Sequence, residues 1–301
     1  MPDQTKPPAL LLLGASGVLG ATLVNAWGAD RVIATHFAHP RPQSQQFDAR
    51  TDDVKSLWAD CPTPPQAAIV MLGITSLDAC AKDPVGSAET NVGAVKRVLD
   101  QLDASGIPSV FVSSDGVFPG DRSWWEEADT PRPILEYGRQ KLQVEQHLLR
   151  RPGAMVVRIP KLLEDDAVGT GMLAGWMGAL GKPGAILCAT DQYFSPASAR
   201  DVARAILNLT AKRCEGIFHV AGSERCSRRE LLGEIMDEYE KFSPVVATVN
   251  HCRLVDIPVL EPRPLDTSMR SDRMKAHLGF ALRGATEVAR AAVRQHFRQL
   301  S

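Results

Sequence analysis

The segment Leu10–Val24 reads LLLLGASGVLGATLV and joins an apolar run to three glycines spaced Gly14-x-x-Gly17-x-x-Gly20. The apolar run predicts a buried strand over residues 9–14, and the residues after Gly17 have the pattern of a helix. Glycines at these places permit a tight turn, close approach of a pyrophosphate to the backbone and close packing of the helix. Because they directly follow a strand, we interpret the segment as a dinucleotide-binding turn rather than a purely structural one.

Short apolar runs alternate with longer helical patterns through the first 160 residues. This alternation is typical of βαβ units, which build a parallel sheet covered by helices on both faces. We therefore expect an α/β fold of the Rossmann type, a doubly wound parallel sheet with a smaller C-terminal substrate lobe. The expected strands cover residues 9–14, 31–37, 67–73, 109–114, 155–159 and 216–222.

The ends of two helices are predicted from capping and stop residues. Ser87 is expected to cap a helix whose apolar face extends over Val92–Leu102 and which stops before Gly106. A second helix is expected over about 135–150, because an apolar stripe covers that range and Pro152 follows it.

The pattern becomes less regular after residue 160, which suggests a second folding unit. The dinucleotide-binding domain is expected to comprise 1–160 and about 191–222. About 161–190 and 223–301 then form the substrate lobe, and the two parts are expected to share one interface because no long linker separates them.

Composition excludes several classes of protein. The 301 residues are 44% hydrophobic, and 34 Lys+Arg against 35 Asp+Glu leave a net charge of -1, which offers no general attraction to nucleic acid or to an acidic membrane. The six cysteines contain no Cys-x-x-Cys pair, and no run reaches the ~20 apolar residues of a membrane span. We expect a cytoplasmic protein with no nucleic-acid or membrane partner.

The end of the second predicted strand bears on the cofactor. An acid there would hydrogen-bond the ribose 2′-hydroxyl and repel a 2′-phosphate, but the chain reads Thr35-His36-Phe37, followed by basic residues at His39 and Arg41. This favours NADP(H) over NAD(H), with His36 beside the cofactor. The alternative is a solvated loop whose basic residues touch nothing. No metal site is expected, because two histidines alone are too few ligands.

Tyr137 and Lys141 are four residues apart on a predicted helix and therefore share a face. A nearby ammonium stabilises a phenolate and lowers a tyrosine pKa from about 10, which would make the hydroxyl a better proton donor or acceptor. A surface pairing without chemistry is the alternative reading.

Ser113-Ser114-Asp115 end the strand that precedes this helix, at the edge where open α/β folds place ligands. A serine hydroxyl there can bind a carbonyl oxygen that gains charge as hydride arrives at carbon. The alternative is that the serines only begin a turn. Arg158, at the end of a later strand, could reach a phosphate or carboxylate of a substrate or form a structural ion pair.

Six segments resemble the extended short-chain dehydrogenase/reductases, and within them the dTDP-4-dehydrorhamnose reductase family, in the family's order: GASGVLG, VSSDGVFPG, YGRQK, DQYFSPASARDVARAI, GIFHVAG and RPLDTSM. The resemblance covers about residues 9–280. It implies an NAD(P)-binding domain, a lobe for a nucleotide sugar, and reduction of a 4-keto group. Dimers are common in this class, so a homodimer is also an expectation.

The resemblance assigns roles residue by residue. Tyr137 and Lys141 match its catalytic pair, with Lys141 also holding the nicotinamide ribose, and Ser114 takes the place of its Thr or Ser. The implied cofactor-binding residues are Gly14, Ser16, Gly17, Val18, Leu19, Asp48, Ala49, Leu72, Gly73 and Ile74. On the substrate side we expect Ser114, Asp115, Arg158 and the pair Asp191 and Gln192.

Two departures from the family pattern leave other functions open. Gly116 stands where the family has an aromatic residue, and Asp266 replaces the asparagine of its R-P-x-N motif. One alternative is a non-catalytic subunit that keeps the dinucleotide fold, as in the regulatory subunit of methionine adenosyltransferase, which is similar to this family. Another is a nucleotide-sugar epimerase. The retained Tyr137 and Lys141 favour the reductase.

Overall fold

A parallel sheet of seven strands, in the order β11-β6-β5-β4-β1-β2-β3, forms the centre of the protein. The computed structural model describes residues 10–165 and 171–300. The strands of this sheet are β1 (Leu10–Leu13), β2 (Val32–His36), β3 (Ser44–Gln46), β4 (Ala67–Val70), β5 (Ser109–Ser114), β6 (Met155–Ile159) and β11 (Gly216–His219). The expected α/β fold with a parallel sheet is confirmed.

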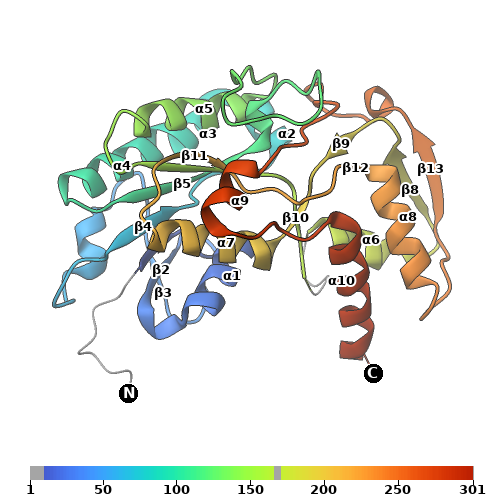
Figure 1. Cartoon of the computed structure of the whole chain (residues 1–301), viewed down its shortest axis with the longest axis horizontal. Coiled ribbons are helices and arrows are strands. Elements are labelled where there is room, and N and C mark those ends of the chain that lie inside the picture. The colour runs from blue at the N-terminus through green and yellow to red at the C-terminus, as the bar shows by residue number, and fades with distance from the viewer. Residues whose placement is uncertain (1–9, 166–170, 301) are drawn as a thin grey trace.

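Helices cover both faces of the sheet, which explains why its central strands are rich in apolar residues. Leu10 and Leu12 of β1 face one core, and Leu11 and Leu13 face the other. Figure 1 shows α1 and α7 beneath the sheet, with α4 and α5 above it. The covering helices are α1 (Val18–Trp27), α7 (Ala199–Ala211) and α9 (Asp272–Leu278) on one side, and α2 (Leu77–Lys82), α3 (Pro84–Ala88), α4 (Val95–Ala104) and α5 (Glu136–Leu148) on the other.

The predicted cap at Ser87 is wrong, although the stop at Gly106 is confirmed by its positive φ of 68°. Ser87 lies inside α3, which Asp83 caps through a hydrogen bond from Gly86 N to its carboxylate at 2.9 Å. A π-helical segment, Glu89–Ala94, then joins α3 to α4. The wider π turn has no distinct apolar period, so the sequence predicted one continuous helix.

A smaller lobe is built from separate stretches of the chain around a second apolar core. Figure 1 shows it at the right, with α6, α8 and α10 beside the short strands. Its strands pair as β7 with β10, β9 with β12 and β8 with β13. Its elements are β7 (Leu162–Leu163), α6 (Met172–Leu180), β8 (Ala185–Ala189), β9 (Tyr193–Phe194), β10 (Ala197–Ser198), β12 (Cys226–Ser227), α8 (Arg228–Tyr239), β13 (Thr248–Cys252) and α10 (Ala285–Leu300).

Two segments lie in a different core from the one their predicted domain implies. Phe194, expected in the dinucleotide domain, packs in the core of the lobe. Met274 and Leu282, expected in the lobe, pack with α7 in the core beneath the sheet. The chain therefore crosses between the two parts more often than the sequence suggested.

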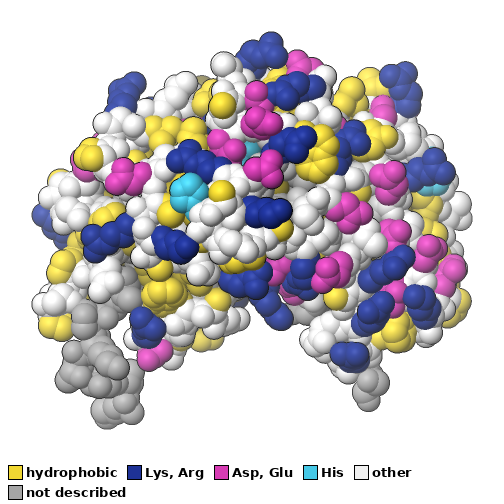
Figure 2. Space-filling model, in the orientation of Figure 1, with side chains coloured by type: hydrophobic (Ala, Val, Ile, Leu, Met, Phe, Trp, Pro, Cys, Tyr) yellow, Lys and Arg dark blue, Asp and Glu magenta, His cyan; other side chains and the backbone are white. Residues whose placement is uncertain are grey.

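Positive and negative side chains are interspersed over the face of the molecule in Figure 2. On that face neither sign forms an extended field. None of the helices within residues 10–165 and 171–300 is long and apolar enough to cross a membrane.

Candidate active site

The glycine turn lies at the point where the sheet order reverses, between β1 and its neighbours β2 and β4. Gly14 has a φ of 90°, and a Cβ there would lie 3.0 Å from the Met71 carbonyl oxygen. A Cβ on Gly20 would lie 2.5 Å from Ala15 Cα, whereas one on Gly17 would meet no atom within 4 Å. Gly14 and Gly20 are therefore required by the turn and by packing, and Gly17 leaves open space.

That open space fits a pyrophosphate. Gly17 is the N-cap of α1, no side chain caps the helix, and its first turn contains no acid, so amide groups and a partial positive charge remain for an anion. Ser16 and Val18 flank Gly17 at the surface, while the Leu19 side chain is buried in the core. Leu19 can therefore offer a ligand only its backbone.

One basic residue after β2, Arg41, is held against the glycine turn. Arg41 Nε donates a hydrogen bond to the Ser16 carbonyl at 3.0 Å, and Ser44 Oγ lies 2.7 Å from His36 Nδ1. The alternative of a loop that touches nothing is therefore wrong. A guanidinium therefore stands beside the glycine turn. Among residues 10–165 and 171–300, no group of His, Cys, Asp and Glu could hold a metal ion.

Asp48 and Ala49 begin the loop after β3. The Asp48 carboxylate forms an ion pair with Arg50 at 2.7 Å, and the hydrogen bonds from Arg50 lower the pKa of Asp48. The Ala49 carbonyl accepts a hydrogen bond from Arg97 at 3.3 Å. Both residues are thus fixed in place, and their predicted contact with adenine stays a prediction.

The loop Leu72–Ile74, at the end of β4, is held by a residue that the sequence analysis missed. Asn91 Oδ1 accepts a hydrogen bond from Ile74 N at 2.6 Å, and its amide donates to the Ile74 carbonyl at 3.0 Å. Gly73 has a φ of 130°, and a Cβ there would lie 2.6 Å from Asn91 Oδ1. Asn91 is buried in the π-helical segment, and the sequence offered no clear signal for it, because it follows the polar pair Glu89 and Thr90.

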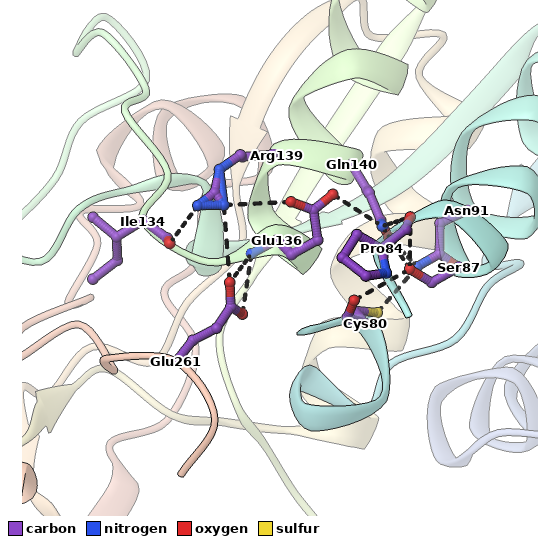
Figure 3. Close-up of polar contacts among 9 residues, drawn as sticks. All are labelled: Cys80, Pro84, Ser87, Asn91, Ile134, Glu136, Arg139, Gln140 and Glu261. Carbon is purple, nitrogen blue, oxygen red and sulfur yellow. Dashed lines mark hydrogen bonds and ion pairs between the residues drawn. The ribbon is translucent and has the colours of Figure 1, made fainter. Parts of the chain in front are cut away.

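Figure 3 shows how the same Asn91 side chain contacts Gln140 of α5. Its amide also donates to Gln140 Oε1 at 2.7 Å, and Gln140 Nε2 donates to Ser87 Oγ at 2.7 Å. Gln140 further donates to Glu136 Oε1 at 3.2 Å. Gln140 lies within the YGRQK motif, and its side chain fixes α5 against α3 rather than contacting a ligand.

The N-terminus of α5 is capped from a distant part of the chain. Its N-cap residue, Leu135, has no polar side chain, and Glu136 N instead donates to both carboxylate oxygens of Glu261, at 3.0 and 3.2 Å (Figure 3). Glu261 belongs to the segment 253–266, which we call the strap. Arg263 of the strap also pairs with Asp78 on α2. The strap therefore joins the lobe to the helix that carries Tyr137.

Tyr137 and Lys141 lie on one face of α5, with Lys141 Nζ 5.6 Å from the centre of the tyrosine ring. The ammonium donates to the Val112 carbonyl at 3.1 Å, and burial lowers the pKa of Lys141 to about 8. Burial, and then the nearby carboxylate of Asp115, raise the pKa of Tyr137 above its ordinary value. The predicted lowering of the tyrosine pKa is thus wrong, and the phenol stays protonated, as a proton donor requires.

Ser114 and Asp115 form a hydrogen-bonded unit beside Tyr137. Ser114 Oγ donates to Asp115 Oδ1 at 2.9 Å and accepts from Gly116 N at 3.1 Å, so Ser114 also begins a short turn. Thr267 Oγ1 donates to Asp115 Oδ2 at 2.7 Å, a contact that the sequence analysis missed. Burial raises the pKa of Asp115. A Cβ on Gly116 would lie 3.8 Å from Tyr137 Cδ1, so its missing side chain leaves space over the tyrosine.

Arg158 does not reach a substrate. Its side chain is 2% exposed and pairs with Glu145 of α5, with 2.7 Å between Nη2 and Oε2. His219 lies beside this pair, 3.4 Å from Arg158, and burial lowers the pKa of His219 to about 3. The ion-pair alternative is confirmed, and substrate binding by Arg158 is withdrawn.

Two acids of the lobe side are engaged with the protein itself. Asp191 Oδ1 accepts a hydrogen bond from Leu254 N at 2.6 Å. Asp266, the acid that departs from the family motif, pairs with Arg225 at 2.7 Å. Gln192 contributes its carbonyl oxygen, which accepts from Arg228 N at 3.0 Å. The departure at Asp266 therefore has a structural partner and does not place a free acid beside a ligand.

Comparisons with known proteins give the family. Residues 8–297 match the RmlD substrate binding domain. The chain is 28% identical over 283 residues to methionine adenosyltransferase 2 subunit beta of Rattus norvegicus, covering 88% of this chain and 81% of the relative. It is 30% identical over 223 residues to a probable low-salt glycan biosynthesis reductase, Agl14, of Haloferax volcanii, covering 69% and 72%.

Comparison with solved structures points to the same family. The hypothetical dTDP-4-dehydrorhamnose reductase of Sulfolobus tokodaii superposes with a TM-score of 0.80 at 28% identity, covering 91% of this chain and 96% of the other. Sequence and fold thus lead to one conclusion: the chain belongs to the dTDP-4-dehydrorhamnose reductase-like family of the extended short-chain dehydrogenase/reductases.

Proposed function

We propose that the protein is an NADPH-dependent reductase of a keto sugar, namely a 4-keto-6-deoxy nucleotide sugar. The observation that carries the proposal is the meeting of Tyr137, Lys141 and Ser114 at the carboxyl edge of the sheet. The half-buried Tyr137 phenol stays protonated because burial and Asp115 raise its pKa. A positioned acid beside a hydroxyl donor is what the reduction of a carbonyl needs.

In this proposal each residue has one task. Tyr137 gives its proton to the carbonyl oxygen of the sugar, and the Ser114 hydroxyl turns from Asp115 to hydrogen-bond that oxygen. Lys141 places a positive charge 5.6 Å from the tyrosine ring, which stabilises the phenolate left after proton transfer. A bound nicotinamide supplies the hydride.

The glycine turn and Arg41 support NADP(H) as the cofactor. Gly17 and the uncapped start of α1 would hold the pyrophosphate. Arg41, fixed on the Ser16 carbonyl, would pair with a 2′-phosphate, since a guanidinium matches phosphate in shape and charge.

The test is NADPH oxidation, followed by absorbance, with a panel of 4-keto-6-deoxy nucleotide sugars. We expect turnover with at least one of them, and Tyr137→Phe should lower kcat about 10²- to 10⁴-fold, as expected for loss of a general acid. Tyr239→Phe is the matched control, because Tyr239 packs in the core of the lobe. Equal rates in the Tyr137→Phe variant and the wild type would refute the assignment.

A non-catalytic subunit is the second candidate, and the similarity to methionine adenosyltransferase 2 subunit beta favours it. It predicts that NADPH binds but that no sugar in the panel is reduced, and that the chain forms a complex with a methionine adenosyltransferase. An epimerase would instead interconvert sugars without net oxidation of NADPH. The oxidation assay therefore separates the reductase from the other two functions, and analysis of the sugars after incubation separates the epimerase, which changes them, from the subunit, which does not.

A further inference from the structure

Arg228, the first residue of α8, has an unusual environment for an arginine of the lobe. Its guanidinium carbon lies 5.2 Å from the centre of the Trp176 ring. Other arginines nearby pair with acids, as Arg225 does with Asp266 and Arg294 does with Glu238. No carboxylate within residues 10–165 and 171–300 forms an ion pair or hydrogen bond with the Arg228 guanidinium, and burial lowers the pKa of Arg228.

A half-buried cation that no carboxylate of the described residues pairs with reduces stability, because no opposite charge there offsets its removal from water. Trp176, which is 8% exposed, holds the guanidinium on its ring and leaves the hydrogen-bonding edges of the guanidinium for another group. The backbone around Arg228 is rigid: Ser227 caps α8 in a capping box, and Arg228 N donates to the Gln192 carbonyl. Such an arrangement is preorganised for an anion.

A short chain of contacts connects Arg228 to the catalytic edge of the sheet. Asp115 accepts a hydrogen bond from Thr267, whose backbone N donates to the Tyr193 carbonyl at 3.1 Å. Tyr193 of β9 pairs in turn with Ser227 of β12. Two steps between neighbouring backbones, each ~4.8 Å, place Ser227 about 10 Å from Thr267. Figure 1 shows β9 and β12 between the large sheet and α8.

We propose that Arg228, stacked on Trp176, binds the diphosphate of the substrate's nucleotide. The inference rests on the proposed reductase function, because it assumes that the sugar is reduced beside Tyr137. An extended ligand with its sugar at Tyr137 and its phosphates at Arg228 would span the distance between the two. Arginine suits this task, because its planar fork can donate two hydrogen bonds to one phosphate.

The experiment measures the binding of dTDP, UDP and GDP by calorimetry, with no turnover required. Wild type should bind at least one of them, and Arg228→Gln should weaken that binding about ten- to a hundredfold, the loss expected for hydrogen bonds to a charged group. Arg229→Gln is the matched control, because Arg229 is the next residue of the same helix and is exposed. Thymidine and uridine, which lack phosphate, should bind the wild type and Arg228→Gln equally.

A second measurement separates a binding role from a structural one. If Arg228 serves a ligand, Arg228→Gln should have a thermal midpoint equal to or above that of the wild type, because an unpaired charge is removed. A lower midpoint together with weaker binding would overturn the proposal, as would equal losses in Arg229→Gln. Absence of diphosphate binding in the wild type would also overturn it.

Failure of this inference is distinguishable from failure of the proposed function. Diphosphate binding that depends on Arg228 without NADPH oxidation would support the subsite and refute the reductase. NADPH oxidation with rates and KM unchanged in Arg228→Gln would support the reductase and refute the subsite.

Discussion

Burial, more than charge pairing, sets the protonation of the groups around Tyr137. It raises the pKa of the Tyr137 phenol and of the Asp115 carboxyl, and it lowers that of the Lys141 ammonium to about 8. Each shift favours the neutral form. Under the proposed function, the sugar carbonyl would therefore meet a phenol that keeps its proton.

Arg41 should decide between the two nicotinamide cofactors. Arg41→Ala removes the guanidinium beside the glycine turn, so we expect NADPH to bind about tenfold or more weakly, with NADH binding unchanged. Titrations followed by cofactor fluorescence measure both affinities. Arg31→Ala is the control, because Arg31 lies before β2, at the end of that strand away from the glycine turn. Equal losses for NADH and NADPH would show that Arg41 acts on the turn and not on a phosphate.

Lys141 should make stability depend on pH. Its pKa falls from 10.5 in the unfolded chain to about 8 in the folded protein, so between these values the unfolded chain binds more protons and stability rises with pH. Below pH 8 the folded protein carries Lys141 as a buried ammonium, so the full free-energy cost of burying that charge is present. We therefore expect Lys141→Met to be more stable than the wild type at pH 7. The difference between their free energies of unfolding should become smaller toward pH 10. Urea unfolding at both pH values measures it, and a gap independent of pH would contradict the prediction.

At the residue scale, the sequence predicted the placement of those site residues whose geometry is local. The glycine turn and the Tyr137/Lys141 spacing are of this kind, because neighbours in the chain determine both. Arg158 could not be assigned from sequence, since its partner Glu145 lies on another element and either role suits a buried arginine. The pKa of Tyr137 was mispredicted because burial outweighs a cation four residues away.

At the scale of elements, α5 depends on a cap that no neighbouring residue provides. Glu261→Gln removes the charge that faces the helix N-terminus and should cost about 1 kcal/mol of stability. It should also speed hydrogen exchange at the Glu136 amide, which then loses its charged acceptor. Because Tyr137 lies in the first turn of α5, kcat should change more than KM. Glu240→Gln at an exposed position is the control. Unchanged exchange at Glu136 would show that the cap does not hold the helix.

The strands of the large sheet were predicted more reliably than the helices between them. Five central strands are buried on both faces and read as continuous apolar runs, whereas β3 (Ser44–Gln46) is a polar edge strand and was missed. The α3 and π-helical region was predicted as one helix because its polar residues, Ser87 and Asn91, are buried by contacts with α5. Such contacts between distant elements leave no periodic trace in the sequence.

At the scale of the whole molecule, the two parts should unfold together. The lobe is assembled from stretches before and after β11, and the strap and α9 return the chain to the large sheet. Unfolding of either part would remove residues from the core of the other, so we expect one transition in urea. Far-ultraviolet circular dichroism and the fluorescence of Trp176, isolated by comparison with Trp176→Phe, should give the same midpoint. Two separated midpoints would show that the parts are independent.

The contribution of α10 to the core of the lobe has a consequence for biosynthesis. The large sheet gains its last strand once β11, ending at His219, has emerged from the ribosome. The core of the lobe instead waits for Ala285–Val293, which are translated after the last strand of the large sheet. Over that interval the apolar faces of α6 and α8 are made but uncovered. The nascent chain therefore carries a large sheet with all its strands and a lobe with exposed apolar surface at the same time, and the lobe is the part that a chaperone acting on nascent chains would shield.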